Sequence, residues 1–231
     1  MYDLPYENMK PPSHFQQMVN IDQRSSVLNV KQEAFGYMDQ LTGWCTKAKA
    51  SILMDIILKT KAETIVEIGV WGGKSLIPMA CALRANGKGQ IHGIDPWDSQ
   101  ASIQWSENEV NKVWWGSIDH DAIMRGLFAK MYEFRLEDYV ILTKTTSQEA
   151  TPIFEIDLLH VDGNHSNQTS LGDVMKWVPL VKHGGWIVFD DINWYENGIF
   201  QTAEAVDWLN KNCVQLAEFS DDSIWGIWIK L

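Results

Sequence analysis

The stretch that decides the fold runs from residue 156 to residue 192 and reads IDLLHVDGNHSNQTSLGDVMKWVPLVKHGGWIVFDDI. Two short apolar runs lie within it, at residues 158–161 and 186–189, and each ends in aspartate. Between them apolar residues recur at helical spacing, and we expect Gly184–Gly185 to close that helix because glycine tolerates a positive φ. A strand, a helix and a second continuous apolar strand predict a parallel βαβ unit that is buried on both faces.

Three aspartates follow the two predicted strands. Asp162 comes directly after the first strand, and Asp190 and Asp191 come after the second. The carboxyl ends of parallel strands open onto the ligand crevice of such a sheet, so these side chains are expected to meet at one edge. Crowded carboxylates repel one another unless a cation or a proton lies among them. The pattern therefore predicts a cation site at this edge.

A glycine-rich turn follows an earlier predicted strand, residues 64–68. The turn, GVWGGKS at residues 69–75, leads into a new helical pattern, an arrangement that brings backbone N–H groups against a ligand. Its spacing matches neither the P-loop nor the dinucleotide GxGxxG pattern. Glu67, two residues before the first glycine, would repel a phosphate and suits a cationic or hydroxyl-bearing ligand.

The next predicted strand, residues 90–94, ends at Asp95, which lies 26 residues after Gly69. An acid at the end of the second strand is placed to accept hydrogen bonds from ribose hydroxyls. Together with Glu67 and the glycine turn, Asp95 predicts a binding site for a nucleoside.

These motifs resemble a known family. ETIVEIGVWGGKS and GQIHGIDPWD look like the binding half of the class I S-adenosylmethionine-dependent methyltransferases. The stretch at residues 156–192 resembles the metal-dependent O-methyltransferase branch, which includes macrocin-type sugar enzymes and, more distantly, catechol enzymes. The resemblance spans residues 61–192 and implies a doubly wound α/β fold. Its sheet would be seven-stranded and mostly parallel with an antiparallel C-terminal strand, which suits the hairpin predicted at residues 214–229.

The resemblance also implies site residues and cofactors. It places Mg²⁺, or another divalent cation, on Asp162, Asp190 and Asp191, and Asp162 joins His165 as the expected catalytic pair. A histidine has an unperturbed pKa that suits proton uptake near neutral pH, so we expect His165 to be the general base. We expect S-adenosylmethionine to contact Glu67, Gly69, Gly72, Ser75, Asp95, Trp97, Ser147, Gln148 and Asp162.

Composition limits the classes of partner. The 231 residues carry a formal net charge of −11, which argues against nucleic acid and anionic membrane surfaces as partners. The three cysteines are widely spaced and form no CxxC pair, as expected for buried thiols in a reducing compartment. The first residues contain no apolar signal core, and no run is long enough to span a membrane. We therefore expect a cytoplasmic protein.

We divide the chain into an N-terminal arm and one catalytic domain. Residues 1–42 predict an arm of short helices that packs over a cleft or against a second subunit, so a homo-oligomer is left open. Residues 43–231 are expected to form the methyltransferase domain. Within it, residues 97–135 read as an insertion that forms a substrate lid with aromatic walls.

The leading hypothesis is a Mg²⁺-dependent O-methyltransferase. Its acceptor would be a hydroxyl of a small molecule with vicinal oxygens, such as a sugar or a glycosylated natural product. A catechol-type acceptor is an alternative that these residues do not separate from a sugar. A nucleotide-dependent oxidoreductase on a similar fold is a second alternative, against which the absence of GxGxxG argues. An acidic metal-binding module is a third, and it leaves the glycine turn unexplained.

Overall fold

The computed structural model describes residues 13–105 and 108–231, and for residues 13–25 it describes the backbone alone. Its centre is a seven-stranded sheet with the strand order β3-β2-β1-β4-β5-β9-β8. The strands are β1 (Thr64–Ile68), β2 (Gln90–Asp95), β3 (Val140–Lys144), β4 (Ile156–Val161), β5 (Val181–Phe189), β8 (Cys213–Ser220) and β9 (Ile224–Lys230). Strands β1 to β5 pair in parallel, and β9 runs antiparallel to both of its neighbours. The predicted fold class is confirmed.

Alternation along the strands gives the sheet two apolar faces. Ile65 of β1 is in register with Ile91 of β2 and Leu158 of β4, and all three belong to one core cluster. The next residues along, Val66 and Leu159, point to the opposite face and belong to the second cluster. Because side chains alternate across a strand, a sheet that is apolar at consecutive positions must be covered on both sides.

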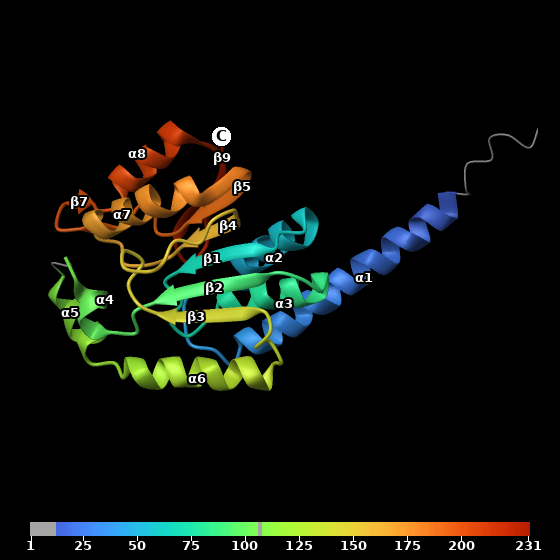
Figure 1. Ribbon diagram of the computed structural model, residues 1–231, viewed down its shortest axis with the longest axis horizontal. Helices are drawn as coiled ribbons and strands as arrows, with labels where there is room; N and C mark the ends of the chain where they lie inside the picture. The colour runs from blue at the N-terminus through green and yellow to red at the C-terminus, as the bar shows by residue number, and fades with distance from the viewer. Residues whose placement is uncertain (1–12, 106–107) are drawn as a thin grey trace, which may run out of the picture.

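Helices cover both faces (Figure 1). The helices are α1 (Ser13–Met38), α2 (Lys47–Thr60), α3 (Leu76–Asn86), α4 (Ser99–Ile103), α5 (Glu109–Gly116), α6 (His120–Glu133), α7 (Asn167–Trp177) and α8 (Ala203–Asn212). Side chains of α1, α2, α3 and α6 pack in the first cluster, and those of α7 and α8 pack in the second. Thr46 caps α2 by accepting a hydrogen bond from the Lys49 N–H at 3.0 Å.

The N-terminal arm differs from the expectation of short helices. Within its described part the chain forms a single helix, α1, of 26 residues. Ala34 and Met38 near its end are buried, and Glu33 forms an ion pair with Arg84 of α3 at 2.6 Å. The end of the arm therefore packs on the core of its own chain. Residues 1–12 of the predicted arm lie outside the described residues.

Gly184 and Gly185 do not close the helix as expected. Helix α7 ends at Trp177, a 3₁₀ turn (Val178–Leu180) with Pro179 follows, and both glycines lie inside β5. Proline cannot continue the helix, so the chain turns several residues earlier than the glycines predict. Gly184 has a φ of +77°, and the pairing of β4 with β5 shifts register nearby, which is the irregularity that glycine accommodates within a strand.

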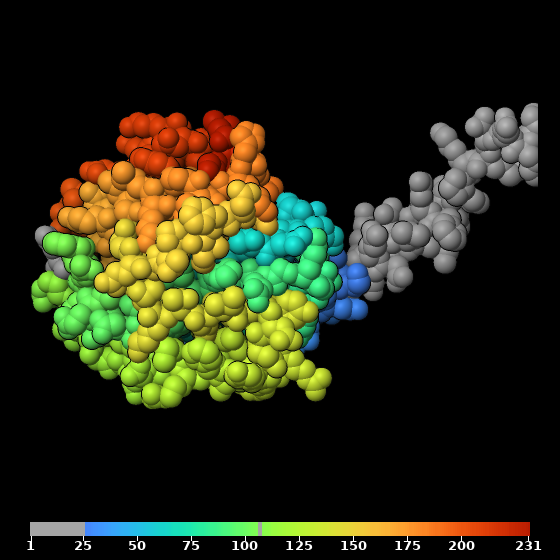
Figure 2. Space-filling model, in the orientation of Figure 1, coloured from blue at the N-terminus to red at the C-terminus, as the bar shows by residue number. Residues whose placement is uncertain are grey.

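The carboxyl ends of the parallel strands face the end of the molecule that carries α4, α5 and a small hairpin (Figure 1). The hairpin consists of β6 (Tyr195–Glu196) and β7 (Ile199–Phe200), which the sequence did not predict. Of the predicted lid, α4 and α5 lie here, whereas α6 buries Leu127 and Met131 in the core and is part of the domain layer. Figure 2 shows the green α4–α5 segment and the orange-red part of the chain meeting at this end. Among the described residues, no helix is both long enough and apolar enough to cross a membrane.

Gly69 offers a test of the turn that follows β1. It has a φ of +83°, and a Cβ atom there would lie 2.0 Å from the Asp162 carbonyl oxygen. Gly87 has a φ of +72° but open space around the same position, so Gly87→Ala is a matched control for backbone strain alone. We expect Gly87→Ala to cost about 1–2 kcal/mol and Gly69→Ala more than about 3 kcal/mol in chemical denaturation. Equal costs would contradict the close approach of the turn to the strand end.

Candidate functional site

The glycine turn after β1 is shaped by Asp95 at the end of β2. Asp95 Oδ2 accepts hydrogen bonds from the backbone N–H groups of Val70 and Trp71, both at 2.9 Å. Its Oδ1 accepts from the Trp97 N–H at 2.7 Å. Burial raises the pKa of the Asp95 carboxyl, and these N–H donors oppose that rise. The residue predicted to bind ribose thus also fixes the turn, and its ligand role stays a prediction.

Two tryptophans beside Asp95 hold strained backbone conformations. Trp71 has a φ of +50° and Trp97 a φ of +41°, values that bulky residues adopt at a cost of about 1–3 kcal/mol each. The Trp97 indole N–H donates to the Trp71 carbonyl at 2.9 Å, so the two strained residues brace each other. Such strain is concentrated where a crevice needs a backbone shape of its own.

A buried polar chain runs from this turn across the ends of β1, β4 and β5. The Ser75 hydroxyl donates to Glu67 Oε1, which lies 2.9 Å from His160 Nδ1. His160 Nε2 lies 3.1 Å from Asp190 Oδ2, and all four side chains are buried. Burial raises the Glu67 pKa to about 8 and lowers that of His160, so a neutral imidazole lies between the two acids. Both ring nitrogens of His160 therefore have partners.

Lys49 of α2 is the last member of this series of buried polar contacts. The sequence did not identify it as a site residue. Its ammonium is bonded to Asp190 Oδ2 and lies 3.8 Å from Asp162 Oδ2, while only 3% of the residue is exposed. Lys49 shares the buried face of α2 with Leu53, four residues on. A lysine on the apolar stripe of a helix was the available signal, because lysines are almost never buried without a partner.

The three predicted metal ligands lie in two overlapping groups. His160, Asp162 and Asp190 form one group and Asp162, His165 and Asp191 the other, with ligand atoms within 4.8 Å of one another in each. Asp190 Oδ1 is buried and has no hydrogen-bond partner among the described residues. Carboxylate oxygens with an imidazole suit a divalent cation. The donor set therefore fits the predicted ion, whose presence stays a prediction.

His165 is oriented by one of these aspartates. Its Nε2 lies 3.0 Å from Asp191 Oδ2, and its ring lies 5.2 Å from that of Trp194. Burial lowers the pKa of His165, but hydrogen bonding to Asp191 and the charges of Asp191 and Asp162 outweigh it, so the net pKa is raised. A carboxylate only accepts, so Nε2 carries the proton and Nδ1 is the nitrogen that can take one up.

Asn164 joins the loop after β4 to the lid. Its amide nitrogen lies 3.3 Å from the Ala101 carbonyl oxygen, 3.2 Å from that of Ser102 and 2.9 Å from that of Gln104. Its Oδ1 accepts a hydrogen bond from the Ser166 N–H at 2.8 Å. Asn164 stands between Asp162 and His165 in the chain, so α4 is fastened directly to the loop that carries both.

The loop after β3, which carries the predicted cofactor residues Ser147 and Gln148, is held by Asp173 of α7. Asp173 Oδ1 accepts hydrogen bonds from the Ser147 hydroxyl and, at 3.0 Å, from the Gln148 amide. Lys176 donates to the carbonyls of Ser147, Gln148 and Ala150 at 2.7–2.9 Å. The two predicted cofactor residues are thus fixed by α7, a role that the sequence did not reveal for Asp173.

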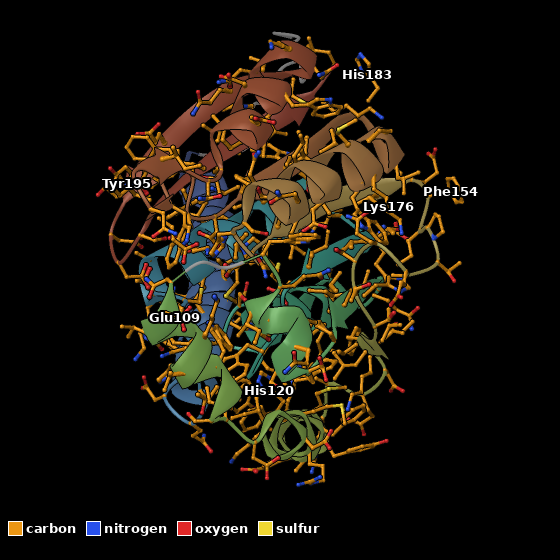
Figure 3. The ribbon with its side chains drawn as sticks, turned by 90° about the vertical axis from the view of Figure 1, so that its left-hand side faces the viewer. Glu109, His120, Phe154, Lys176, His183 and Tyr195 are labelled. Atoms are coloured by element: carbon orange, nitrogen blue, oxygen red, sulfur yellow. The ribbon has the colours of Figure 1, made fainter. Side chains whose placement is uncertain are left out.

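Aromatic rings from three segments meet beside the glycine turn. This aromatic cluster consists of Trp44, Trp71, Trp114, Trp115 and His120, with neighbouring ring centroids 4.8–6.3 Å apart. Trp44 is 61% exposed and also lines a cleft of about 370 Å³ with Cys45, Thr46 and Lys74. In Figure 3, His120 and Glu109 lie below the strand ends and Tyr195 lies above them. These rings could form the predicted aromatic walls, with Trp44 and Trp71 coming from outside the lid, and the lid's role toward a substrate stays a prediction.

The fold is an α/β sheet whose strand order reverses between β1 and β4, the switch point at which such sheets bind ligands. A family model described as a methyltransferase domain matches residues 66–192, more than half of the sequence. The chain belongs to this methyltransferase family, and the prediction of a methyltransferase is confirmed. No curated protein matches the sequence.

Solved structures share the fold. The O-methyltransferase TomG from Streptomyces achromogenes, involved in tomaymycin synthesis and solved with SAM, is 13% identical and has a TM-score of 0.60; the match covers 89% of each chain. The Bacillus cereus O-methyltransferase in complex with SAH is 15% identical with a TM-score of 0.58, covering 89% of this chain and 91% of that one. The SAH-bound Podospora anserina methyltransferase PaMTH1 is 12% identical with a TM-score of 0.58, covering 99% and 100%. At these identities the likeness establishes the fold alone.

Asp173 predicts a pH dependence of stability. Burial raises its pKa to about 6, above the ordinary value of 3.8. An acid whose pKa is raised on folding binds protons more tightly when folded, so its stabilising contribution grows as the pH falls from 7.5 to 5. Relative to Asp173→Asn, which cannot titrate, the native protein should gain about 1 kcal/mol over this range. Urea denaturation at both pH values measures the difference; a constant difference would contradict the raised pKa.

Proposed function

We propose that the protein is an S-adenosylmethionine-dependent O-methyltransferase that uses a divalent cation, such as Mg²⁺. Its acceptor would be a small molecule with vicinal oxygens, such as a sugar or a glycosylated natural product. The observation that carries the proposal is the meeting, at one sheet edge, of the glycine turn and the Asp162–His165–Asp191 group. The glycine turn, which we propose binds the cofactor, and His165, which we propose accepts the proton, therefore lie at the same edge of the sheet.

Unpartnered polar atoms support a ligand at the turn. Among the described residues, Glu67 Oε2 and Trp71 Nε1 are buried without hydrogen-bond partners. Buried polar groups are rarely left unpaired in native proteins, so each such group needs an explanation. One lies at the end of β1 and the other in the glycine turn. S-adenosylmethionine offers an ammonium group and a carboxylate, which can pair with an acceptor and a donor respectively.

His165 supplies the proton transfer. S-adenosylmethionine, when bound, provides an activated methyl group, so the protein must orient the acceptor oxygen and take up its proton. Asp191 holds the Nε2–H of His165, which directs the lone pair of Nδ1 to the acceptor side and stabilises the imidazolium that forms. A divalent cation on the aspartates would hold the two adjacent acceptor oxygens and lower the pKa of the reacting hydroxyl.

The aromatic cluster supports a ring-shaped acceptor. Trp44 presents an exposed face next to the cleft, and Trp71 connects the cluster to the cofactor turn. Large aromatic side chains bury much apolar area at a low cost in conformational entropy. A cyclic acceptor carrying two neighbouring oxygens meets both the cluster and the carboxylates. Sugar and catechol acceptors share this chemistry, and an acceptor panel separates them.

Substitutions should separate cofactor binding from catalysis. We expect Asp191→Ala and Asp162→Ala to abolish metal-dependent methyl transfer while S-adenosylmethionine still binds. His165→Ala should lower kcat by about 10²–10⁴-fold with little change in either affinity. Asp95→Ala should weaken cofactor binding first. Asp207→Ala, which removes an exposed aspartate on α8, is the matched control.

The first measurement is titration calorimetry of S-adenosylmethionine with and without Mg²⁺, followed by methyl transfer to sugar and catechol acceptors. Failure of the native protein to bind the cofactor would overturn the proposal. Normal methylation by the Asp162 and Asp191 variants in the presence of chelator would overturn the metal-dependent part.

Trp44 should determine acceptor affinity. Because its exposed ring faces the cleft, Trp44→Ala should raise the KM of a cyclic acceptor by about tenfold, equivalent to one aromatic contact, and leave cofactor affinity unchanged. Trp105→Ala is the control, since Trp105 is 59% exposed yet takes no part in the ring contacts of the aromatic cluster. An equal effect of both variants on KM would argue against the cluster as an acceptor surface.

A further inference from the structure

The carboxylates at the strand ends greatly outnumber the buried cations beside them. Glu67 and Asp190 are buried and Asp162 is half-buried in the same neighbourhood, whereas Lys49 is the buried lysine that reaches them among the described residues. Buried like charges cannot remain together without compensation. The Lys49 ammonium compensates Asp162 and Asp190, while burial raises the pKa of Glu67 to about 8, so Glu67 keeps its proton at neutral pH.

Lys49 is held firmly in this position. Thr46 caps the start of helix α2, three residues before Lys49. Leu53 lies on the same face of the helix as Lys49 and is fully buried in the core. The ammonium also lies 5.8 Å from the centre of the Trp225 ring, which is itself buried. The Lys49 side chain is therefore held in the interior by its own helix and by Trp225 of strand β9.

We propose that Lys49 is a positioning residue that acts as the resident cation of the carboxylate cluster. It holds Asp190 against His160 and keeps the cluster assembled in the absence of a divalent ion. Its charge also weakens the affinity of the cluster for such an ion. The last statement rests on the proposed function, because it concerns the same aspartates as the proposed metal site.

Two effects of Lys49 on a divalent ion oppose each other. By orienting Asp190, Lys49 raises the affinity for the ion. Hydrogen-bond partners that orient a metal ligand in this way are worth about 10–100-fold in metal affinity. By repulsion it hinders the site, since it lies 3.8 Å from Asp162 Oδ2, a proposed ligand. Near a protein surface, a unit charge and a double charge a few ångströms apart repel each other strongly. This repulsion lowers the affinity for the ion by a factor that is more than about ten times larger than the factor gained by orienting Asp190. Repulsion is the larger effect, so removing Lys49 should tighten metal binding.

The test compares Lys49→Met with Lys47→Met. Lys47 lies on the same helix but pairs with exposed Asp39, so its loss removes the same charge without touching the cluster. In titration calorimetry with Mg²⁺ alone, Lys49→Met should bind at least about tenfold more tightly than the native protein, and Lys47→Met should not differ. A role confined to packing would lower stability without tightening metal binding.

Thermal unfolding gives a second readout. With chelator present, Lys49→Met should lower Tm by roughly 6–15 °C, because a buried carboxylate loses its partner, and Mg²⁺ should restore much of this loss. Without added metal, the Tm of the native protein should change by less than about 1 °C on addition of chelator, since Lys49 remains in place. Lys49→Met/Asp190→Asn, which removes both charges, should recover part of the Tm.

Three results would overturn the inference. The first is a native Tm that falls with chelator when no metal has been added. The second is a Lys49→Met variant that binds Mg²⁺ no more tightly than Lys47→Met, and the third is an absence of Mg²⁺ binding in both variants. If Lys49→Met does not fold, the chelator experiment on the native protein and a comparison with Lys49→Arg, which should keep native Mg²⁺ affinity, still decide the question. Failure of the native protein to bind S-adenosylmethionine would overturn the proposed function and leave the role of Lys49 standing.

Discussion

The ion pair between Lys49 and Asp190 makes it possible for several acids to share one sheet edge. A parallel sheet directs the ends of β1, β4 and β5 to the same place, and here each of these ends carries a carboxylate: Glu67, Asp162 and Asp190. Burial alone would force protons onto these groups or separate the strands. One lysine from α2, which lies 141 residues away from Asp190 in the chain, offsets that conflict at Asp190 and Asp162, whereas Glu67, with its pKa raised to about 8, keeps its proton at neutral pH.

The acids that remain are each given a separate task by their surroundings. Asp95 uses both carboxylate oxygens on backbone N–H groups and so determines the shape of the turn after β1. Asp173 fixes the loop after β3, and Asp191 orients His165. The same residue type therefore acts as a backbone clamp, a loop anchor and a histidine partner, because hydrogen-bond partners and burial differ at each position. The glycine turn, the loop after β3 and the orientation of His165 are therefore all set by aspartates.

The sequence predicted well whatever depends on local pattern. Residues 64–68 were placed correctly as a strand, because β-branched runs ending in glycine have few alternatives. Asp162 and Asp191 were brought together by the rule that parallel strands end at one edge. The sequence could not reveal contacts made across the chain: Lys49 has no motif, and its partner is defined only once α2 packs on the sheet. Gly184 misled because Pro179 had already ended the helix, and proline acts before a later glycine can.

The fastening of the lid by Asn164 has a consequence for how far the lid sequence can vary. Asn164 reaches the carbonyl oxygens of Ala101, Ser102 and Gln104, which every amino acid possesses. Side chains along α4 and α5 can therefore be exchanged without breaking the connection to the loop that bears His165. The sequence of α4 and α5 can thus vary while the position of this segment against the loop that bears His165 is retained.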